Sequence, residues 1–172
     1  MSRTRYAISW LYGEFRIARL HRDEIAEQWE SPAQVESYAD LVKVLDEAAQ
    51  AIDLGDKGDV TVVHEHDLHT HEYLEVPAMK RRDLEKYLHR RVHQDKSFDE
   101  EAAWCFHQVA HAGGKEGVLL HLLPKRIVKS TVAACGAVGL APKQYVPLTE
   151  IVSDYLPTLD LDADDMVVVV AC

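Results

Sequence analysis

The order of apolar patterns between residues 73 and 147 constrains the fold of this chain more than any other feature. Alternating apolar residues predict a strand that ends at Pro77, and a helical pattern of apolar and basic residues follows it. An aromatic strand comes next, then an apolar strand and a helix that Gly139 is expected to end. This order predicts an α+β unit. Its apolar positions are Leu74, Val76, Leu84, Leu88, Val92, Trp104, Phe106 and residues 118–123.

Three short strand patterns precede a helical pattern in the amino-terminal part. Turn residues separate the strands, so they are expected to form an antiparallel meander. Ser31 and Pro32 are residue types that start helices, and Ser31 is predicted as the N-cap of a helix that Gly55 ends. A further strand is expected at residues 60–64. The three strands of the meander are predicted at residues 6–10, 15–20 and 24–29.

The segments LEVPAMKRRDLEKYLHRRV, KSFDEEAAW and AACGAVGLAPKQYVPL, at these spacings, resemble the inserted domain of PilM-like and GspL-like actin-fold proteins. Those proteins are cytoplasmic scaffolds of type IV pilus and type II secretion machines. The resemblance implies a partial actin-like, ribonuclease H-like subdomain in residues 1–72 and 142–172. It also implies an inserted α+β domain of the PilM/FtsA 1C type in residues 73–141.

The resemblance further implies a bacterial, non-catalytic interaction protein. In the family, a cytoplasmic actin-like protein binds the short amino-terminal tail of a PilN-like inner-membrane partner. The inserted domain takes part in contacts between subunits. We therefore expect a cytoplasmic protein that is recruited to the inner face of the membrane.

Composition agrees with a protein-binding role. The formal net charge of −10 argues against nucleic acid as a partner. The longest apolar runs fall far below the roughly 20 residues that span a bilayer, so we expect no direct membrane insertion. Three cysteines at unrelated spacings indicate neither a disulfide framework nor a zinc knuckle, and a reducing cytoplasm is the simplest setting.

The first hairpin departs from the nucleotide-binding pattern of actin-fold ATPases, which use an early Asp and small residues whose amides approach phosphate. Alignment of the hairpin places Ser9 where the Asp is expected, and bulky side chains where Gly and Ser are expected. The second acidic position falls on Val170 or Ala171. We therefore expect a degenerate phosphate loop, no cofactor and no catalytic residue. The loop consists of Ser9, Leu11, Tyr12 and Gly13. An actin-like ATPase that is active only in a full-length form is an alternative.

A histidine cluster is the basis of another alternative, a metal-binding enzyme or sensor. If residues 67–68 form a two-residue turn, the first histidine faces the fourth and the second faces the third, on one side of a ribbon. Imidazole nitrogens bind zinc, nickel or copper. However, Asp67-Leu68 is a poor turn dipeptide, and the spacing fixes no carboxylate beside the histidines, so we expect no metal. The four residues are His64, His66, His69 and His71.

Two further surfaces are candidates for binding other proteins. A basic helix is a candidate docking face for an acidic peptide. Residues 166–171 form an uncharged, β-prone segment that is expected to pair with a second copy of the chain, because an exposed edge strand is a template for pairing. In the resembled family this segment opens the second actin-like half. The basic residues are Lys80, Arg81, Arg82, Lys86, Arg90 and Arg91.

Overall fold

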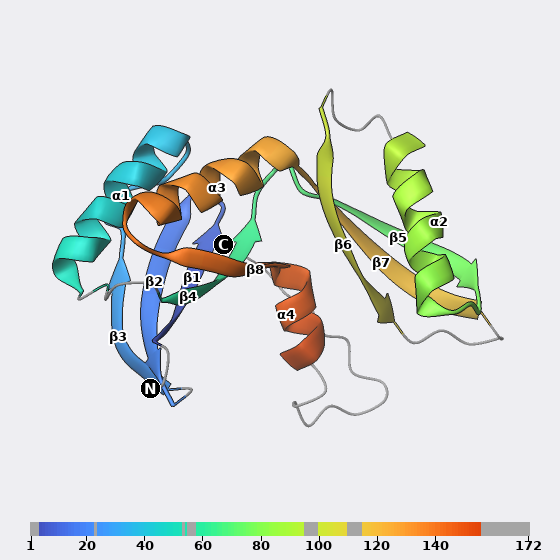
Figure 1. The fold of residues 1–172 in the computed structure, drawn as a ribbon, viewed down its shortest axis with the longest axis horizontal. Helices are drawn as coiled ribbons and strands as arrows, with labels where there is room; N and C mark the ends of the chain where they lie inside the picture. The colour runs from blue at the N-terminus through green and yellow to red at the C-terminus, as the bar shows by residue number, and fades with distance from the viewer. Residues whose placement is uncertain are drawn as a thin grey trace. The chain divides into compact units, whose positions relative to one another are not determined.

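The computed structural model describes residues 4–22, 24–52, 54, 58–94, 100–109 and 115–155. Of residues 153–155, only the backbone is described. The chain forms two compact units (Figure 1). The first consists of Met1–Asp67 together with Lys129–Cys172, and the second of Leu68–Val128. The expected self-association segment at residues 166–171, and with it Val170 and Ala171, lies outside the described residues.

The first unit is built on a five-stranded mixed sheet. Its strands are β1 (Arg5–Leu11), β2 (Glu14–His21), β3 (Glu24–Glu30), β4 (Asp59–Glu65) and β8 (Ala141–Pro147). Their order is β3-β2-β1-β4-β8; the first three form the predicted antiparallel meander, and β4 runs parallel to both β1 and β8. The sequence did not predict β8, whose Pro142 and Pro147 are tolerated because the strand lies at the sheet edge.

Two helices, α1 (Tyr38–Ala51) and α3 (Lys125–Ala137), cover one face of this sheet. The short α4 (Leu148–Tyr155) follows β8 and contacts β8 and β4. Figure 1 shows α1 and α3 over the same face, as right-handed crossovers between parallel strands require. Every second residue of β1 is buried, and one side of α1 is buried as well. The core of this unit includes Tyr6, Ile8, Trp10, Phe15, Ile17, Leu41, Val44, Leu45, Ala48, Val60 and Val62.

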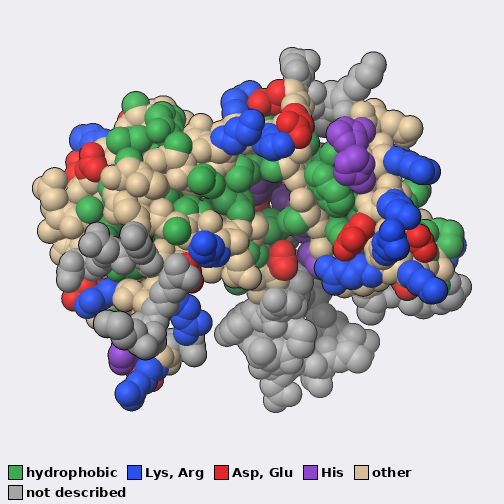
Figure 2. All heavy atoms as spheres, in the orientation of Figure 1, with side chains coloured by type: hydrophobic (Ala, Val, Ile, Leu, Met, Phe, Trp, Pro, Cys, Tyr) green, Lys and Arg blue, Asp and Glu red, His purple; other side chains and the backbone are tan. Residues whose placement is uncertain are grey.

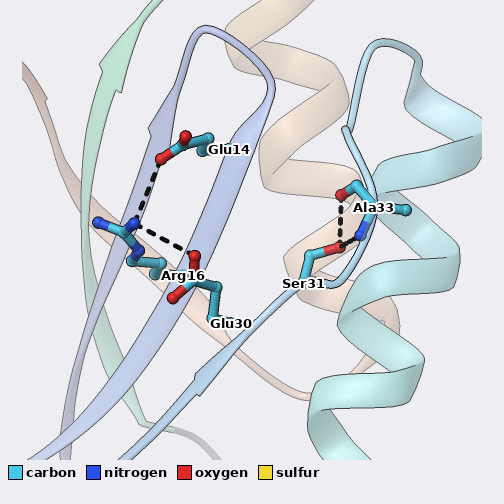
Figure 3. A network of polar contacts seen from close by, with 5 residues as sticks. All are labelled: Glu14, Arg16, Glu30, Ser31 and Ala33. Carbon is cyan, nitrogen blue, oxygen red and sulfur yellow. Dashed lines mark hydrogen bonds and ion pairs between the residues drawn. The ribbon is translucent and has the colours of Figure 1, made fainter. Parts of the chain in front are cut away.

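The start of α1 corrects the prediction that Ser31 is its N-cap. The hydroxyl of Ser31 instead donates to the carbonyl of Ala33 at 2.7 Å and accepts from its amide at 3.2 Å (Figure 3). The true cap is Ser37, which forms a reciprocal capping box with Asp40. Val35 explains why the helix starts later. The chain around Val35 is non-helical, its side chain is buried, and its carbonyl accepts a hydrogen bond from the indole of Trp10 at 3.0 Å.

The ends of the helices agree in part with the sequence. Gly55, predicted to end α1, lies outside the described residues, and the helix already ends at Ala51. Gly139 ends the region of α3 as predicted: its φ is +80°, and the next amide, of Leu140, donates to the carbonyl of Cys135 at 2.9 Å. Glycine favours this left-handed conformation because it has no Cβ.

The second unit is a three-stranded antiparallel sheet with one helix on one face. Its elements are β5 (Thr70–Pro77), α2 (Arg81–Gln94), β6 (Ala102–Val109) and β7 (Lys115–Pro124), with strand order β5-β7-β6. Leu84 and Leu88 of α2 form one buried cluster with Val76 and Val118, and Val92 forms a second cluster with neighbouring residues of β7. The predicted α+β unit is therefore present.

The unit begins and ends earlier in the chain than the predicted inserted domain, residues 73–141. The boundary precedes β5, because all of β5 pairs with β7. The later boundary falls within α3, most of which belongs to the first unit.

The two-residue hairpin considered for the four histidines does not form. β4 pairs with β1 and β8, whereas β5 pairs with β7 in the other sheet. The backbone of β4 finds its hydrogen-bond partners in strands that are distant in sequence, so residues 67–68 connect two sheets rather than two paired strands.

Candidate functional site

The turn between β1 and β2 occupies the place of the expected phosphate loop. Tyr12 and Gly13 have φ values of 49° and 90°, and Leu11 pairs directly with Glu14. Positive φ at both central residues is typical of the tight type I′ hairpin turn. A Cβ added at Gly13 would lie 2.1 Å from Oε1 of Gln34, so this side of the turn is already filled.

The backbone groups of this turn bond to neighbouring segments of the first unit. The Tyr12 amide donates to the carbonyl of Glu65 at 3.0 Å, and the Gly13 carbonyl accepts from the amide of Val35 at 2.8 Å. Phosphate binding by a loop requires amides that point at the ligand. The Tyr12 amide is committed to another carbonyl instead.

The electrostatics at the turn are also unfavourable to phosphate. Partial burial raises the pKa of the Tyr12 phenol, and the nearby carboxylates of Glu65 and Asp67 raise it further. Ser9 lies within β1, paired with Arg16 on one side and Val63 on the other, and it supplies no carboxylate for a metal ion. The position therefore combines negative charge with a closed backbone.

The sheet face beside this turn carries a small charged network. Arg16 of β2 contacts Glu14 and Glu30 through one guanidinium nitrogen, at 3.2 Å each (Figure 3). A cavity of about 590 Å³ lies on the first sheet, and its lining includes Ser9, Arg16 and Trp29. Because both carboxylates contact Arg16, its positive charge is balanced locally.

Five of the six predicted basic residues lie on α2, where they divide into two groups. Figure 2 shows Lys and Arg side chains gathered over this helix, with acidic side chains among them. Arg81 pairs with Glu85 at 3.2 Å and lies 5.8 Å from the centre of the Phe106 ring, while Arg91 pairs with Glu72 of β5. Arg81 thus contacts the sheet through Phe106 of β6, and Arg91 through Glu72 of β5.

The other cations face away from the sheet. Arg82, Lys86 and Arg90 are exposed and four residues apart, so they form one stripe about 12 Å long, opposite the buried face of the helix. We call these three residues the basic stripe. Within the described residues, no ion pair or hydrogen bond of the stripe side chains is found. Lys80 precedes the helix, and its carbonyl accepts from the amides of Asp83 and Leu84.

The four predicted histidines are divided between the two units. His64 is fully buried in the first unit, with its ring centre 4.8 Å from that of Trp10 and 5.4 Å from that of Tyr145. His66 stacks on His64 at 6.1 Å. His64 thus behaves as a packed core residue.

His69 and His71 lie at the start of the second sheet, where they meet histidines that the sequence analysis did not select. His121 of β7 stands directly opposite His71, and His107 of β6 follows on the third strand. The signal for His121 was its position as a polar residue inside an apolar run. Its partners became visible only with the strand register.

Cys135 has the character of a structural cysteine. Cys135 of α3 is buried, and this burial raises the pKa of its thiol to about 12. A thiol with so high a pKa remains protonated and is a poor nucleophile at neutral pH. Burial likewise raises the pKa of the neighbouring Tyr145 phenol.

Comparison with solved structures places this arrangement among known folds. The chain superimposes on the PilM–PilN type IV pilus biogenesis complex with a TM-score of 0.69 and 13% sequence identity, over 90% of this chain and 49% of that chain. It shares the actin-like fold of PilM. The cytoplasmic domain of EpsL, an inner membrane component of the type II secretion system of Vibrio cholerae, matches with a TM-score of 0.54 and 11% identity, over 84% and 55% of the two chains.

The likeness to these proteins lies in the fold. No family model and no curated protein sequence matches the chain. The chain spans about half the length of the two structures. The fold confirms the predicted partial actin-like architecture. In the part of the chain that the structure describes, no helix has both the length and the apolar character needed to cross a bilayer.

Proposed function

We propose that this chain is a non-catalytic assembly protein of a type IV pilus or type II secretion machine. The observation that carries the proposal is the match of 90% of the chain to a solved PilM–PilN complex at a TM-score of 0.69. In this proposal, the actin-like fold serves as a frame that binds another protein. The site of action is the cytoplasm, at the inner face of the inner membrane.

The partner we propose is the amino-terminal cytoplasmic tail of a PilN-like inner-membrane protein. PilN is the component found with PilM in the matching structure. The basic stripe of Arg82, Lys86 and Arg90 supports a role for charge, because three adjacent cations without ion pairs in the described part of the chain attract an acidic segment. Self-association through residues 166–171 stays a prediction.

Calorimetry with a synthetic peptide of a PilN-like tail from the same genome tests the partner. We expect saturable binding by the wild-type chain. Replacing Arg82, Lys86 and Arg90 with Gln should weaken it at least tenfold at low salt. The matched control replaces three exposed lysines of the first unit, Lys43, Lys129 and Lys143, with Gln. It removes the same charge and should leave the affinity for the peptide unchanged.

Two outcomes of this experiment have different meanings. No binding of any PilN-like tail by the wild-type chain would contradict the assembly role. Wild-type binding that the stripe variant retains would instead keep the partner and reject the stripe as its docking surface.

The second part of the proposal is that the chain does not use nucleotide. The closed β1–β2 turn supports it: the amide of Tyr12 is bonded to Glu65, and the carboxylates of Glu65 and Asp67 disfavour phosphate. Calorimetry with Mg-ATP should show no binding. A dissociation constant near 10 μM, equivalent to roughly −7 kcal/mol, would favour the alternative of an actin-like ATPase.

A further inference from the structure

Three histidines lie near one another in the second unit: His69 just before β5, His71 within β5, and His121 on the neighbouring strand β7. His71 is the second residue of β5, and His69 lies just before the first residue of that strand. His121 is the residue of β7 that pairs directly with His71. Directly opposed residues hold their Cβ atoms about 4.5–5.5 Å apart, so the imidazoles of His71 and His121 share one surface.

The nitrogens of His71 and His121 are already at chelating distance. Nδ1 of His71 lies 2.8 Å from Nδ1 of His121, and the rings are inclined at 78°. Two imidazole lone pairs do not approach so closely unless a proton or a cation lies between them. With metal–nitrogen bonds of about 2.05 Å, this separation corresponds to an angle of about 86° at the ion, which a tetragonal or distorted tetrahedral site accepts.

His69 supplies a third nitrogen. A ring nitrogen of His69 lies within 4.8 Å of one of His71, and the two ring centres are 5.7 Å apart. In the proposed site, His69 changes its side-chain torsions on metal binding so that this nitrogen reaches the same ion. His71 is exposed and His69 is half-buried, so an ion reaches the group from solvent.

His107 is placed to orient the central ligand. Its Nδ1 lies 3.1 Å from Nε2 of His121, the nitrogen that points away from His71. His121 itself is only 5% exposed, so its ring is held by packing as well as by this contact. A metal-binding histidine whose second nitrogen is hydrogen-bonded has a fixed tautomer and ring orientation.

We propose that His69, His71 and His121 bind one divalent transition-metal ion, with zinc, nickel and copper as the class that three imidazoles favour. His107 is a positioning residue that acts through His121. Three protein ligands leave at least one coordination position open to water or to a ligand from another molecule. The site differs from the one considered from sequence, because His64 and His66 belong to the other sheet. It is independent of the proposed assembly role.

Titration of the tag-free, chelator-treated full chain tests the site. Calorimetry with zinc chloride should show one ion per chain. Addition of Co²⁺ should give visible absorption bands characteristic of imidazole ligation. His69→Ala, His71→Ala and His121→Gln should each weaken zinc binding at least 100-fold and remove the cobalt bands. Circular dichroism establishes whether each variant is folded; if His121→Gln is not, the two variants on β5 decide.

The chain offers a matched control in a second histidine pair. His89 and His93 of α2 are exposed, and their Nε2 atoms lie 3.1 Å apart, but they offer only two nitrogens. Replacing both with Ala should leave the zinc stoichiometry and affinity of the main site unchanged. Loss of binding in this variant, with binding retained in His71→Ala, would place the ion on the helix and overturn the proposal.

The positioning role of His107 has its own signature. His107→Ala should weaken zinc binding about 10–100-fold, and the melting temperature of the metal-free chain should stay unchanged. His107→Gln keeps a polar group able to contact His121 and should restore most of the affinity. The proposal is also overturned if the wild-type chain binds no zinc, or if the His69, His71 and His121 variants bind it as tightly as the wild type.

Discussion

The two units differ in where their polar groups are directed. In the first unit, the turn that corresponds to a phosphate loop closes on its neighbours, with the Tyr12 amide bonded to Glu65 and the Gly13 carbonyl to Val35. In the second unit, the basic stripe on α2 is exposed and imidazoles gather on the sheet. We infer from this difference that the first unit acts as the frame and the second provides the binding chemistry.

Substitutions in the two hydrophobic cores should have the largest effects on the free energy of unfolding. They test whether the two units are stabilised separately. Leu45 of α1 and Leu88 of α2 are both fully buried. Either residue changed to Ala should lower the free energy of unfolding by about 2–5 kcal/mol, because it loses apolar burial and leaves a cavity. In a urea titration followed by amide NMR, signals of the altered unit should disappear first. If the signals of both units disappeared at the same urea concentration in each variant, the two units would not be stabilised separately.

An exposed apolar residue provides the control for these variants. Val132 of α3 is 45% exposed, so Val132→Ala should change the free energy of unfolding by less than about 0.5 kcal/mol.

The closed turn of the first unit should be sensitive to its glycine. Gly13→Ala should lower the free energy of unfolding by about 1–2 kcal/mol, because φ there is +90° and L-residues are strained in that region. Thermal unfolding measures the change. Gly136→Ala is the control: it lies in α3, an added Cβ meets no atom within 4 Å, and the change should be neutral or stabilising. Equal destabilisation by both variants would show that the turn is not constrained.

The two candidate caps of α1 give a smaller effect. Ser37→Ala should cost about 1 kcal/mol, because it removes the capping box, whereas Ser31→Ala should cost clearly less. The hydrogen bond from Ser37 lowers the pKa of Asp40. The carboxylate therefore stabilises the fold above the ordinary Asp pKa, and this contribution is lost as pH falls through the lowered value. Urea unfolding at neutral and acidic pH should show the Ser37→Ala difference shrinking in acid. A greater loss from Ser31→Ala would reverse the assignment.

The smallest effect should separate the two kinds of cation on α2. Arg91→Gln should cost up to about 1 kcal/mol, because Arg91 pairs with Glu72, and the cost should decrease with added salt. Arg90→Gln should have almost no effect on stability, since Arg90 belongs to the exposed stripe. Chemical unfolding at low and high salt measures both. If Arg90→Gln destabilised the chain more than Arg91→Gln, the stripe would have a structural role.

Local patterns predicted most elements because helix and strand periodicity depends on nearby residues. The apolar spacing of Leu84, Leu88 and Val92 correctly predicted α2, and Gly139 correctly predicted where the chain leaves α3. Strand β8 was missed because its prolines disfavour a strand, and only its edge position allows them. The cap of α1 was misplaced because Ser31 has a suitable residue type, but burial of Val35 delays the helix.

Residue types and short spacings were sufficient to predict the α+β class, the meander, the basic helix and the position of the loop between β1 and β2. Three features could be read from the folded chain alone: which charges on α2 form ion pairs, that His64 and His71 belong to different sheets, and that His71 contacts His121. The physical reason is that strand pairing joins residues such as His71 and His121, which lie 50 positions apart, and no local pattern specifies that register.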